Sequence, residues 1–109
     1  MSSTYRITQH AIERYQGRVD ATVSRAEARA LLADLAARSK VRPTPRHWMR
    51  HTVRRPGSRY LYCADRHDIC LVVGGDSVVT VYSRWICRRW KRLDLLERSL
   101  NQITSKLAA

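Results

Sequence analysis

The stretch that decides the fold is ICLVVGGDSVVTVY, from Ile69 to Tyr82. Its first five residues are all apolar, which is typical of a buried central strand. Gly74-Gly75-Asp76 then predicts a tight hairpin into a second strand over residues 78–82, which is rich in β-branched side chains. These two strands define the centre of an antiparallel sheet.

Turn signals upstream of this hairpin extend the sheet. Pro56-Gly57 precedes an extended pattern over residues 59–63, and residues 65–68 form a second turn. Residues 47–54 are a possible first strand. The sequence therefore predicts a meander of three or four antiparallel strands.

Two helices are expected before the sheet. Thr8 is an N-cap candidate for a short helix that ends near Gly17 and carries an apolar series at Ala11, Ile12, Tyr15 and Val19. Ser24 and Glu27 have the spacing of a capping box, which predicts a second helix over residues 25–39. Arg42-Pro43 prevents this helix from continuing.

The last segment is helical again, because apolar residues recur at intervals of three and four at Ile86, Trp90, Leu93, Leu96, Leu100, Ile103 and Leu107. We therefore expect one α+β domain, with two N-terminal helices packed on the antiparallel sheet in a core over residues 1–84. A long amphipathic C-terminal helix over residues 85–109 follows it. The apolar stripe of this helix either packs across the sheet or is covered by a partner or by a second copy of the chain.

Composition limits the class of protein. The chain has 109 residues, 44% of them hydrophobic, which favours a globular domain over a disordered tail. Its longest apolar run, Ile69–Val73, is too short to span a membrane, and the first residues do not resemble a secretion signal. Three cysteines fit no disulfide framework, so we expect a reducing, cytoplasmic setting.

The formal net charge is +12, and it is unevenly distributed. Residues 40–66 carry eight basic side chains and one acidic one, and residues 84–109 carry seven basic and two acidic ones. A GC-rich genome would explain why 18 of the 21 basic residues are arginines, but it would not explain the surplus of positive charge. The charge therefore predicts a polyanionic partner, RNA or another nucleic acid. Because the longest apolar run is too short to span a bilayer, we expect no membrane partner.

Two groups of residues are candidates for chemistry on a phosphate. His10, Arg14 and Arg18 are four residues apart, so they share one face of the first helix. A period of two on the last strand places Val79 and Val81 on one face, and the opposite, open face then carries Val78, Thr80, Tyr82 and Arg84. Arginine offers a bidentate fork to phosphate and tyrosine can stack on a base. The alternatives are a solvated helix face and an ordinary solvent-facing strand.

The densest basic run lies around Trp48, between residues 46 and 59. Cationic side chains chiefly neutralise phosphates, and contacts to six phosphates would make affinity fall by roughly three orders of magnitude between low and physiological salt. A loop kept soluble by its charge is the alternative. The candidate nucleic-acid-binding residues are Arg18, Arg46, His51, Arg54, Arg55, Arg59 and Arg88.

Metal chemistry is not indicated. His47 and His51 are four residues apart, but the chain has neither a C-x-x-C nor an H-E-x-x-H motif, and its nine acidic residues are scattered. We therefore expect no metal and no cofactor. Any catalysis on nucleic acid would be metal-independent cleavage of RNA, in which the ribose 2′-hydroxyl is the nucleophile and the protein supplies an acid, a base and cations.

The helix that opens with His10-Ala11-Ile12-Glu13-Arg14 and the strand Val79-Thr80-Val81-Tyr82 resemble the barnase, EndoU, colicin and RelE type of ribonuclease toxin fold. This resemblance covers about residues 5–84 and implies a RelE-like ribonuclease, of toxin–antitoxin or phage type. It implies that His10 and Arg14 contact or protonate the scissile phosphate and that Thr80 and Tyr82 orient it, and Arg84 is the fifth catalytic candidate. The alternative is a non-catalytic inhibitor or regulator, encoded by a phage or plasmid, that binds nucleic acid or a nucleic-acid-binding enzyme.

Overall fold

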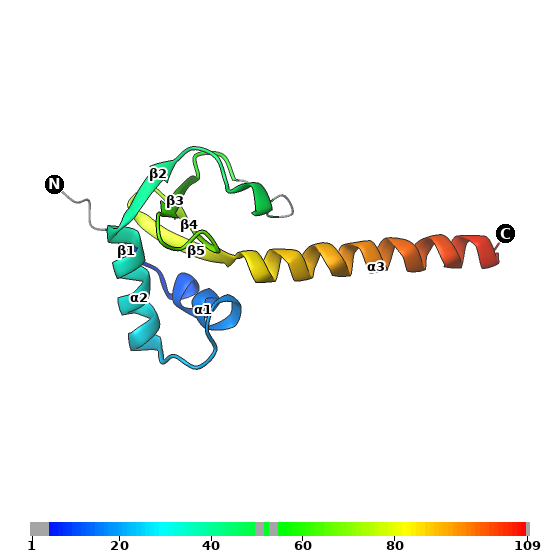
Figure 1. Ribbon diagram of the computed structural model, residues 1–109, viewed down its shortest axis with the longest axis horizontal. Helices are drawn as coiled ribbons and strands as arrows, with labels where there is room; N and C mark the ends of the chain where they lie inside the picture. The colour runs from blue at the N-terminus through cyan, green and yellow to red at the C-terminus, as the bar shows by residue number, and fades with distance from the viewer. Residues whose placement is uncertain (1–4, 50–51, 53–54, 109) are drawn as a thin grey trace.

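The computed structural model describes residues 5–49, 52 and 55–108 (Figure 1). Five strands form one mixed sheet in the spatial order β1-β5-β4-β3-β2. The elements in chain order are β1 (Arg6–Ile7), α1 (Gln9–Arg18), α2 (Arg25–Ala37), β2 (Ser39–Arg42), the 3-10 turn η1 (His47–Met49), β3 (Arg59–Cys63), β4 (Ile69–Gly74), β5 (Ser77–Ser83) and α3 (Arg84–Ala108). The predicted α+β architecture is confirmed, with five strands where three or four were expected.

The meander β3-β4-β5 is antiparallel, as its turn signals predict. Gly57 and Gly75 adopt positive φ angles of 81° and 62°, a conformation that costs other residues energy. Gly57 lies in the turn before β3, and Gly75 lies in the turn of the β4–β5 hairpin. Both turns therefore depend on glycine at these positions.

The two outer strands are not those that the sequence predicts. The expected strand over 47–54 is wrong for residues 47–49, which form η1 and bury Met49, while 50–51 and 53–54 lie outside the described residues. Instead, Ser39–Arg42 pairs with β3, so α2 ends at residue 37. The Ser39 hydroxyl donates to the Leu35 carbonyl in the last turn of this helix. At the opposite edge, the short β1 pairs in parallel with β5.

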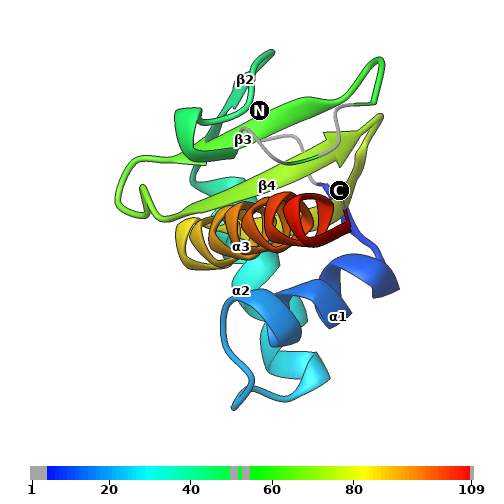
Figure 2. The ribbon, with the colours of Figure 1, turned by 90° about the vertical axis from the view of Figure 1, so that its right-hand side faces the viewer.

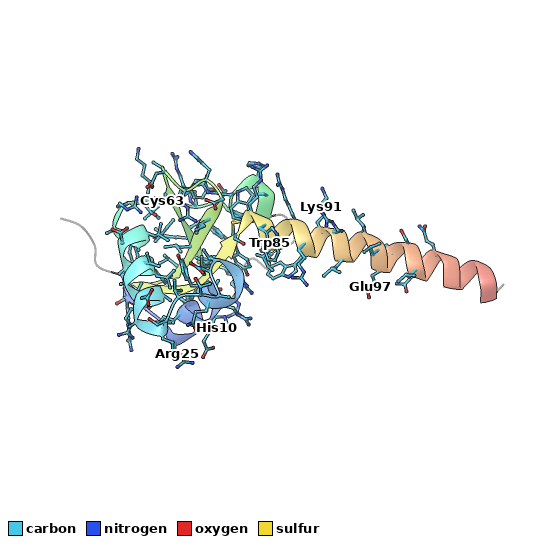
Figure 3. All side chains as sticks on the ribbon, turned by 60° about the horizontal axis from the view of Figure 1, so that its bottom comes forward. His10, Arg25, Cys63, Trp85, Lys91 and Glu97 are labelled. Atoms are coloured by element: carbon cyan, nitrogen blue, oxygen red, sulfur yellow. The ribbon has the colours of Figure 1, made fainter. Side chains whose placement is uncertain are left out.

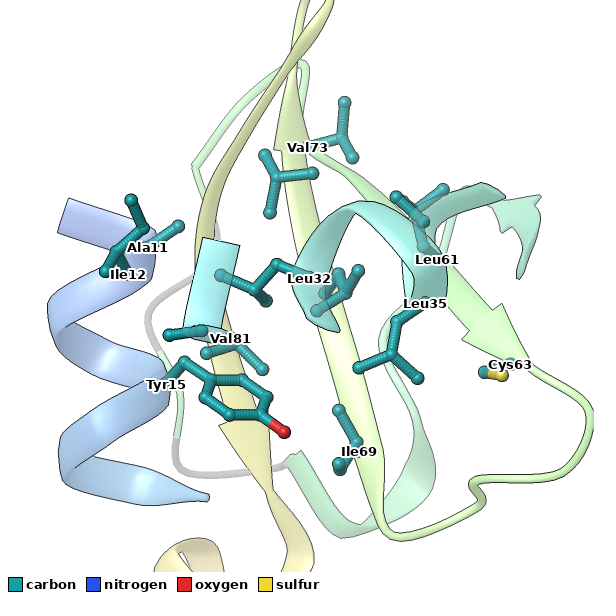
Figure 4. Close-up of a cluster of buried hydrophobic side chains, with 14 residues drawn as sticks. Ala11, Ile12, Tyr15, Leu32, Leu35, Leu61, Cys63, Ile69, Val73 and Val81 are labelled. Atoms are coloured by element: carbon teal, nitrogen blue, oxygen red, sulfur yellow. The ribbon is translucent and has the colours of Figure 1, made fainter. Parts of the chain in front are cut away.

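Helices α1 and α2 begin at the predicted caps and lie together on one side of the sheet (Figure 2). The Thr8 hydroxyl accepts from the amide of Ala11 and donates to the carbonyl of Val78, so it joins the start of α1 to β5. Ser24 accepts from the amide of Glu27 in the expected capping box. The helices bury a core against the sheet that includes Tyr15, Leu32, Leu35, Leu61, Ile69 and Val81 (Figure 4).

A β-bulge in β5 determines which of its side chains face this core. Val72 pairs with Thr80 and Val73 pairs with Val78, so Val79 is the extra residue. Val78 and Val81 therefore face the helices, whereas Val79 and Tyr82 pack on the opposite side, which we call the outer face. The predicted alternation is correct for Val81 and Tyr82 but wrong for Val78 and Val79, because it assumed an unbroken period of two.

The outer face is only partly covered. Met49 of η1 and Ile86 and Cys87 of α3 pack there on Tyr60, Cys70 and Val72. Beyond this contact, α3 extends away from the sheet and makes the molecule 63 Å long (Figure 1). Among the described residues, no helix is both long and apolar enough to cross a membrane.

Candidate functional site

A pocket of about 330 Å³ lies on the outer face, between α1, β5 and the segment that leads into β3. Six of the residues predicted from the sequence line it together: His10, Arg14, Arg18, Arg55, Thr80 and Tyr82. The other lining residues are Thr52, Ser58, Tyr60, Val72 and Val79. The pocket thus brings the cationic face of α1 against the polar side chains of the last strand.

The α1 wall of the pocket is a row of side chains spaced by one helical turn. Figure 3 labels His10 on α1. The Nε of Arg14 donates to Nε2 of His10 over 3.3 Å, and both side chains are exposed. This arrangement follows from the four-residue spacing, which stacks side chains on one helix face. An imidazole and a guanidinium therefore stand side by side at the mouth of the pocket.

Arg18 closes the inner end of this row and is held in place from several directions. One of its terminal nitrogens donates to Thr80 Oγ1 (3.3 Å) and to the carbonyl of Val81 (3.1 Å). Its guanidinium carbon lies 4.6 Å from the ring centre of Tyr82 and 4.9 Å from that of Trp90. Burial lowers the pKa of Arg18, and the neighbouring Tyr82 opposes this shift. Arg18 is thus a preorganised cation with its position fixed before any ligand binds.

The floor of the pocket is apolar and aromatic. Tyr60, Val72 and Val79 line it, and the ring of Tyr82 meets Trp90 edge to face, with ring centres 5.8 Å apart. A floor of this kind supports a planar ring, while cations at the rim hold a charged group. The shape and chemistry therefore suit a ligand with both a base-like and an anionic part.

The described lining of the pocket carries positive charges and no negative ones. No carboxylate is among its described lining residues, and the ion pairs in the described part of the chain use arginines elsewhere. Arg14, Arg18 and Arg55 therefore keep their positive charge directed at the pocket. Such uncompensated cations favour the binding of an anion.

Four of the predicted residues that the structure describes do not line the pocket, namely Arg46, Arg59, Arg84 and Arg88. Arg84 was expected on the open face of the last strand, but β5 ends at Ser83, Arg84 begins α3, and the lining residues that include Thr80 and Tyr82 do not include it. Arg59 alternates with the pocket residue Tyr60 along β3 and therefore lies on the other side of the sheet. Two further candidates, His51 and Arg54, lie outside the described residues.

Arg46 also lies away from the pocket and has a structural position. Its guanidinium carbon is 4.3 Å from the ring centre of Tyr62, and it donates to the carbonyl of Cys63 over 3.2 Å. Its Nε is buried without a hydrogen-bond partner. These contacts attach the segment before η1 to β3.

Arg88 belongs to a second, more open pocket of about 410 Å³ on α3, which it lines with Trp85, Arg89, Arg92 and Leu93. Trp85 is 60% exposed (Figure 3), and the guanidinium carbon of Arg89 lies 5.6 Å from its ring centre. Arg88 thus lies beside other arginines on α3 and does not line the pocket with His10, Arg14, Thr80 and Tyr82.

Sequence reasoning missed the aromatic part of the site. Trp90 was assigned to the apolar stripe of the last helix, yet it contacts Arg18 and Tyr82. Tyr60 could have been found by extending the period of two along β3, since it alternates with the core residue Leu61. The contact of Trp90 had no sequence signal, because it depends on the direction in which α3 leaves the sheet.

Among the residues that the structure describes, no three His, Cys, Asp or Glu side chains come together as metal ligands would. Comparison of the chain with protein-family models, curated proteins and solved structures finds no match. The geometry of the pocket is therefore the basis for a functional proposal.

Proposed function

We propose that the chain binds RNA in the outer-face pocket and cleaves it without a metal ion, as a ribonuclease of the RelE-like toxin or phage type. The observation that carries this proposal is the convergence of His10 with Arg14, Arg18 and Arg55 in a pocket whose described lining holds no carboxylate. The three cysteines are buried free thiols, which supports action in the cytoplasm.

Each group has a role in the proposed reaction. The ribose 2′-hydroxyl attacks the neighbouring phosphorus, the bond to the 5′-oxygen breaks, and a cyclic phosphate and a 5′-hydroxyl are formed. His10 takes the proton of the 2′-hydroxyl or gives one to the departing 5′-oxygen, and solvent water supplies or takes the other proton. Arg14, Arg18 and Arg55 stabilise the charge that develops on the phosphorane. Thr80 and Tyr82 orient the phosphate and the adjacent base.

The test is cleavage of labelled RNA by the purified chain in EDTA. We expect wild type to cut RNA but not the matching DNA, and His10→Ala to lose at least about a hundredfold in rate, the usual contribution of a general acid or base. His67→Ala is the matched control, because His67 is exposed on the β3–β4 turn outside the pocket. No cleavage by wild type, or equal cleavage by wild type and His10→Ala, would overturn the catalytic assignment.

A second function, binding without catalysis, is favoured by one observation. His10 is the one imidazole in the described lining of the pocket, whereas concerted cleavage uses both an acid and a base. In that case the chain is an inhibitor or regulator that occupies nucleic acid, or a nucleic-acid-binding enzyme, through its basic face. Salt-dependent RNA binding with no cleavage would support this function over the first.

A further inference from the structure

The part of α3 that extends from the sheet carries a regular apolar row that the proposed function does not use. Leu93, Leu96 and Leu100 are 52%, 54% and 63% exposed, and they are three and four residues apart. The same spacing continues in the sequence at Ile103 and Leu107. This is the a and d pattern of a heptad repeat, with Leu93 at an a position.

The row is distinct from the surface by which α3 joins the core. Ile86 and Cys87 are buried on the outer face, and Trp90 is half-buried against Tyr82. After Trp90 the helix extends away from the sheet (Figure 1). A row of leucines at this spacing on an extended helix is suited to packing against another helix.

We infer that this row pairs with the same row of a second copy, forming a parallel coiled coil. The charges beside the row support a second copy as the occupant. In heptad terms, the g positions are Arg92, Ser99 and Lys106, and the e positions are Trp90, Glu97 and Thr104. Arg92 and Glu97 carry the opposite charges that flank a self-complementary seam.

The same charges select the parallel orientation. In a parallel pair, a g residue faces the e residue of the next heptad in the partner, so Arg92 of each copy faces Glu97 of the other, giving two attractive pairs. In an antiparallel pair, g faces g and e faces e. The g positions hold only cations and serine, so an antiparallel seam would form no attractive pair.

The pairing has a consequence for the arrangement of the two cores. Parallel helices place both sheets at the same end of the seam, so the two outer-face pockets lie at the same end of the assembly. Two linked sites on one RNA strand raise the effective affinity without new contacts. The pairing itself stands independently of the proposed function.

The molar mass of the full chain in solution, measured by sedimentation equilibrium over a range of concentrations, tests the pairing. We expect a mass of at least two chains for wild type and of one chain for the double variant Leu93→Glu/Leu96→Glu. The matched control is Leu95→Glu, because Leu95 is as exposed as Leu96 (53%) but lies off the row at a c position. A wild type that stays a single chain, or a double variant that associates as wild type does, would overturn the inference, as would capture of a different protein with no self-association.

Charge reversal tests the orientation. Arg92→Glu and Glu97→Arg each replace two attractive pairs with two repulsive ones, so each should raise the dissociation constant by about tenfold. The double variant Arg92→Glu/Glu97→Arg should restore wild-type association. Since these residues are five apart in one helix, they are not neighbours within a chain. A double variant that associates no better than the single ones would overturn the parallel seam.

Discussion

Arg18 is both a structural residue and a site residue. It connects α1 to β5 through Thr80 and the carbonyl of Val81, and it lies between two aromatic rings. A residue with these contacts is expected to contribute to stability as well as to anion binding. The two roles can be separated by measuring unfolding and RNA binding on the same variants.

We expect Arg18→Ala to lower the free energy of unfolding by about 1–3 kcal/mol, because it removes two hydrogen bonds and the packing against both rings. Arg18→Lys should recover less than half of this loss, since lysine has neither the fork nor the planar group. Denaturant unfolding measures both. Arg14→Ala, with an exposed side chain, is the control and should stay within about 0.5 kcal/mol of wild type. A similarly small change for Arg18→Ala would show that these contacts do not stabilise the fold.

Asp65 is one of the carboxylates that make stability depend on pH in acid. The Cys63 thiol donates to Asp65 over 2.7 Å and the Arg38 guanidinium pairs with it, and these bonds lower the pKa of Asp65 to about 2 from its usual 3.8. Because the folded pKa is the lower one, the stabilisation is complete above about pH 4 and is lost as the pH falls through 2.

Asp65→Asn should therefore unfold with a weaker dependence on pH between about 4 and 2 than wild type does, as measured by denaturant unfolding at several pH values. Asp76→Asn, on the β4–β5 turn, is the control and should keep the wild-type dependence. An unchanged dependence in Asp65→Asn would mean that other carboxylates account for the loss of stability in acid.

At the scale of elements, Ser83 joins three of them. It is the last residue of β5, its hydroxyl donates to the Arg18 carbonyl at the end of α1 over 2.7 Å, and it accepts from the amide of Ile86 in the first turn of α3. The hydroxyl is therefore both a helix cap and a connection between helices.

Ser83→Ala leaves a carbonyl and an amide without this partner at a buried position, so we expect a loss of about 1–3 kcal/mol in the free energy of unfolding. Thermal and denaturant unfolding measure the loss. Ser77→Ala at the start of β5, where the hydroxyl donates to the adjacent, exposed Asp76, should change stability by less than about 0.5 kcal/mol. Equal effects of the two substitutions would contradict the role of Ser83 as a junction.

The sequence predicts elements well where local chemistry determines them. Caps at Thr8 and Ser24, and glycines with positive φ at 57 and 75, define α1, α2 and the meander. The outer strands could not be predicted in the same way. β1 has two residues and β2 has four, so neither is long enough to show an alternating pattern in the sequence. Both strands form because they pair with an edge of the sheet.

At the scale of the whole molecule, only a few of the cations that make up the net charge of +12 line the described part of the pocket. Three arginines of the described residues line the pocket, so single-stranded RNA that contacts these three should lose affinity by about twentyfold between roughly 50 and 200 mM salt. This is less than the three orders of magnitude expected from the whole basic run, because Arg46 and Arg59 lie elsewhere.

Binding titrations at several salt concentrations test this. We expect Arg14→Ala and Arg55→Ala each to reduce the slope of log affinity against log salt by about 0.7, the value for one phosphate contact on a single strand. Arg29→Ala, exposed on α2 and outside the pocket, should leave the slope unchanged. A slope that is insensitive to Arg14 and Arg55 would place the bound RNA on another surface.

The site was predictable to the extent that it depends on spacing within single elements. Four-residue steps align His10, Arg14 and Arg18, and Thr80 and Tyr82 share a face of β5, but no local pattern shows that these two groups meet. The bulge was not predictable either, because Val78 and Val79 are identical and no glycine marks it.

The bulge at Val79 also bears on how this strand can change in length over evolution. With Val79 deleted, Val78 would still pair with Val73 and Thr80 with Val72, and the two would become consecutive residues of a ladder without a bulge. Every remaining side chain would then keep its side of the sheet. Deleting Val81 instead would exchange the sides of the residues around it. We expect the Val79 deletion to fold with a wild-type circular dichroism spectrum and the Val81 deletion to lose it. The gene can thus lose one codon here without inverting the outer face of the sheet.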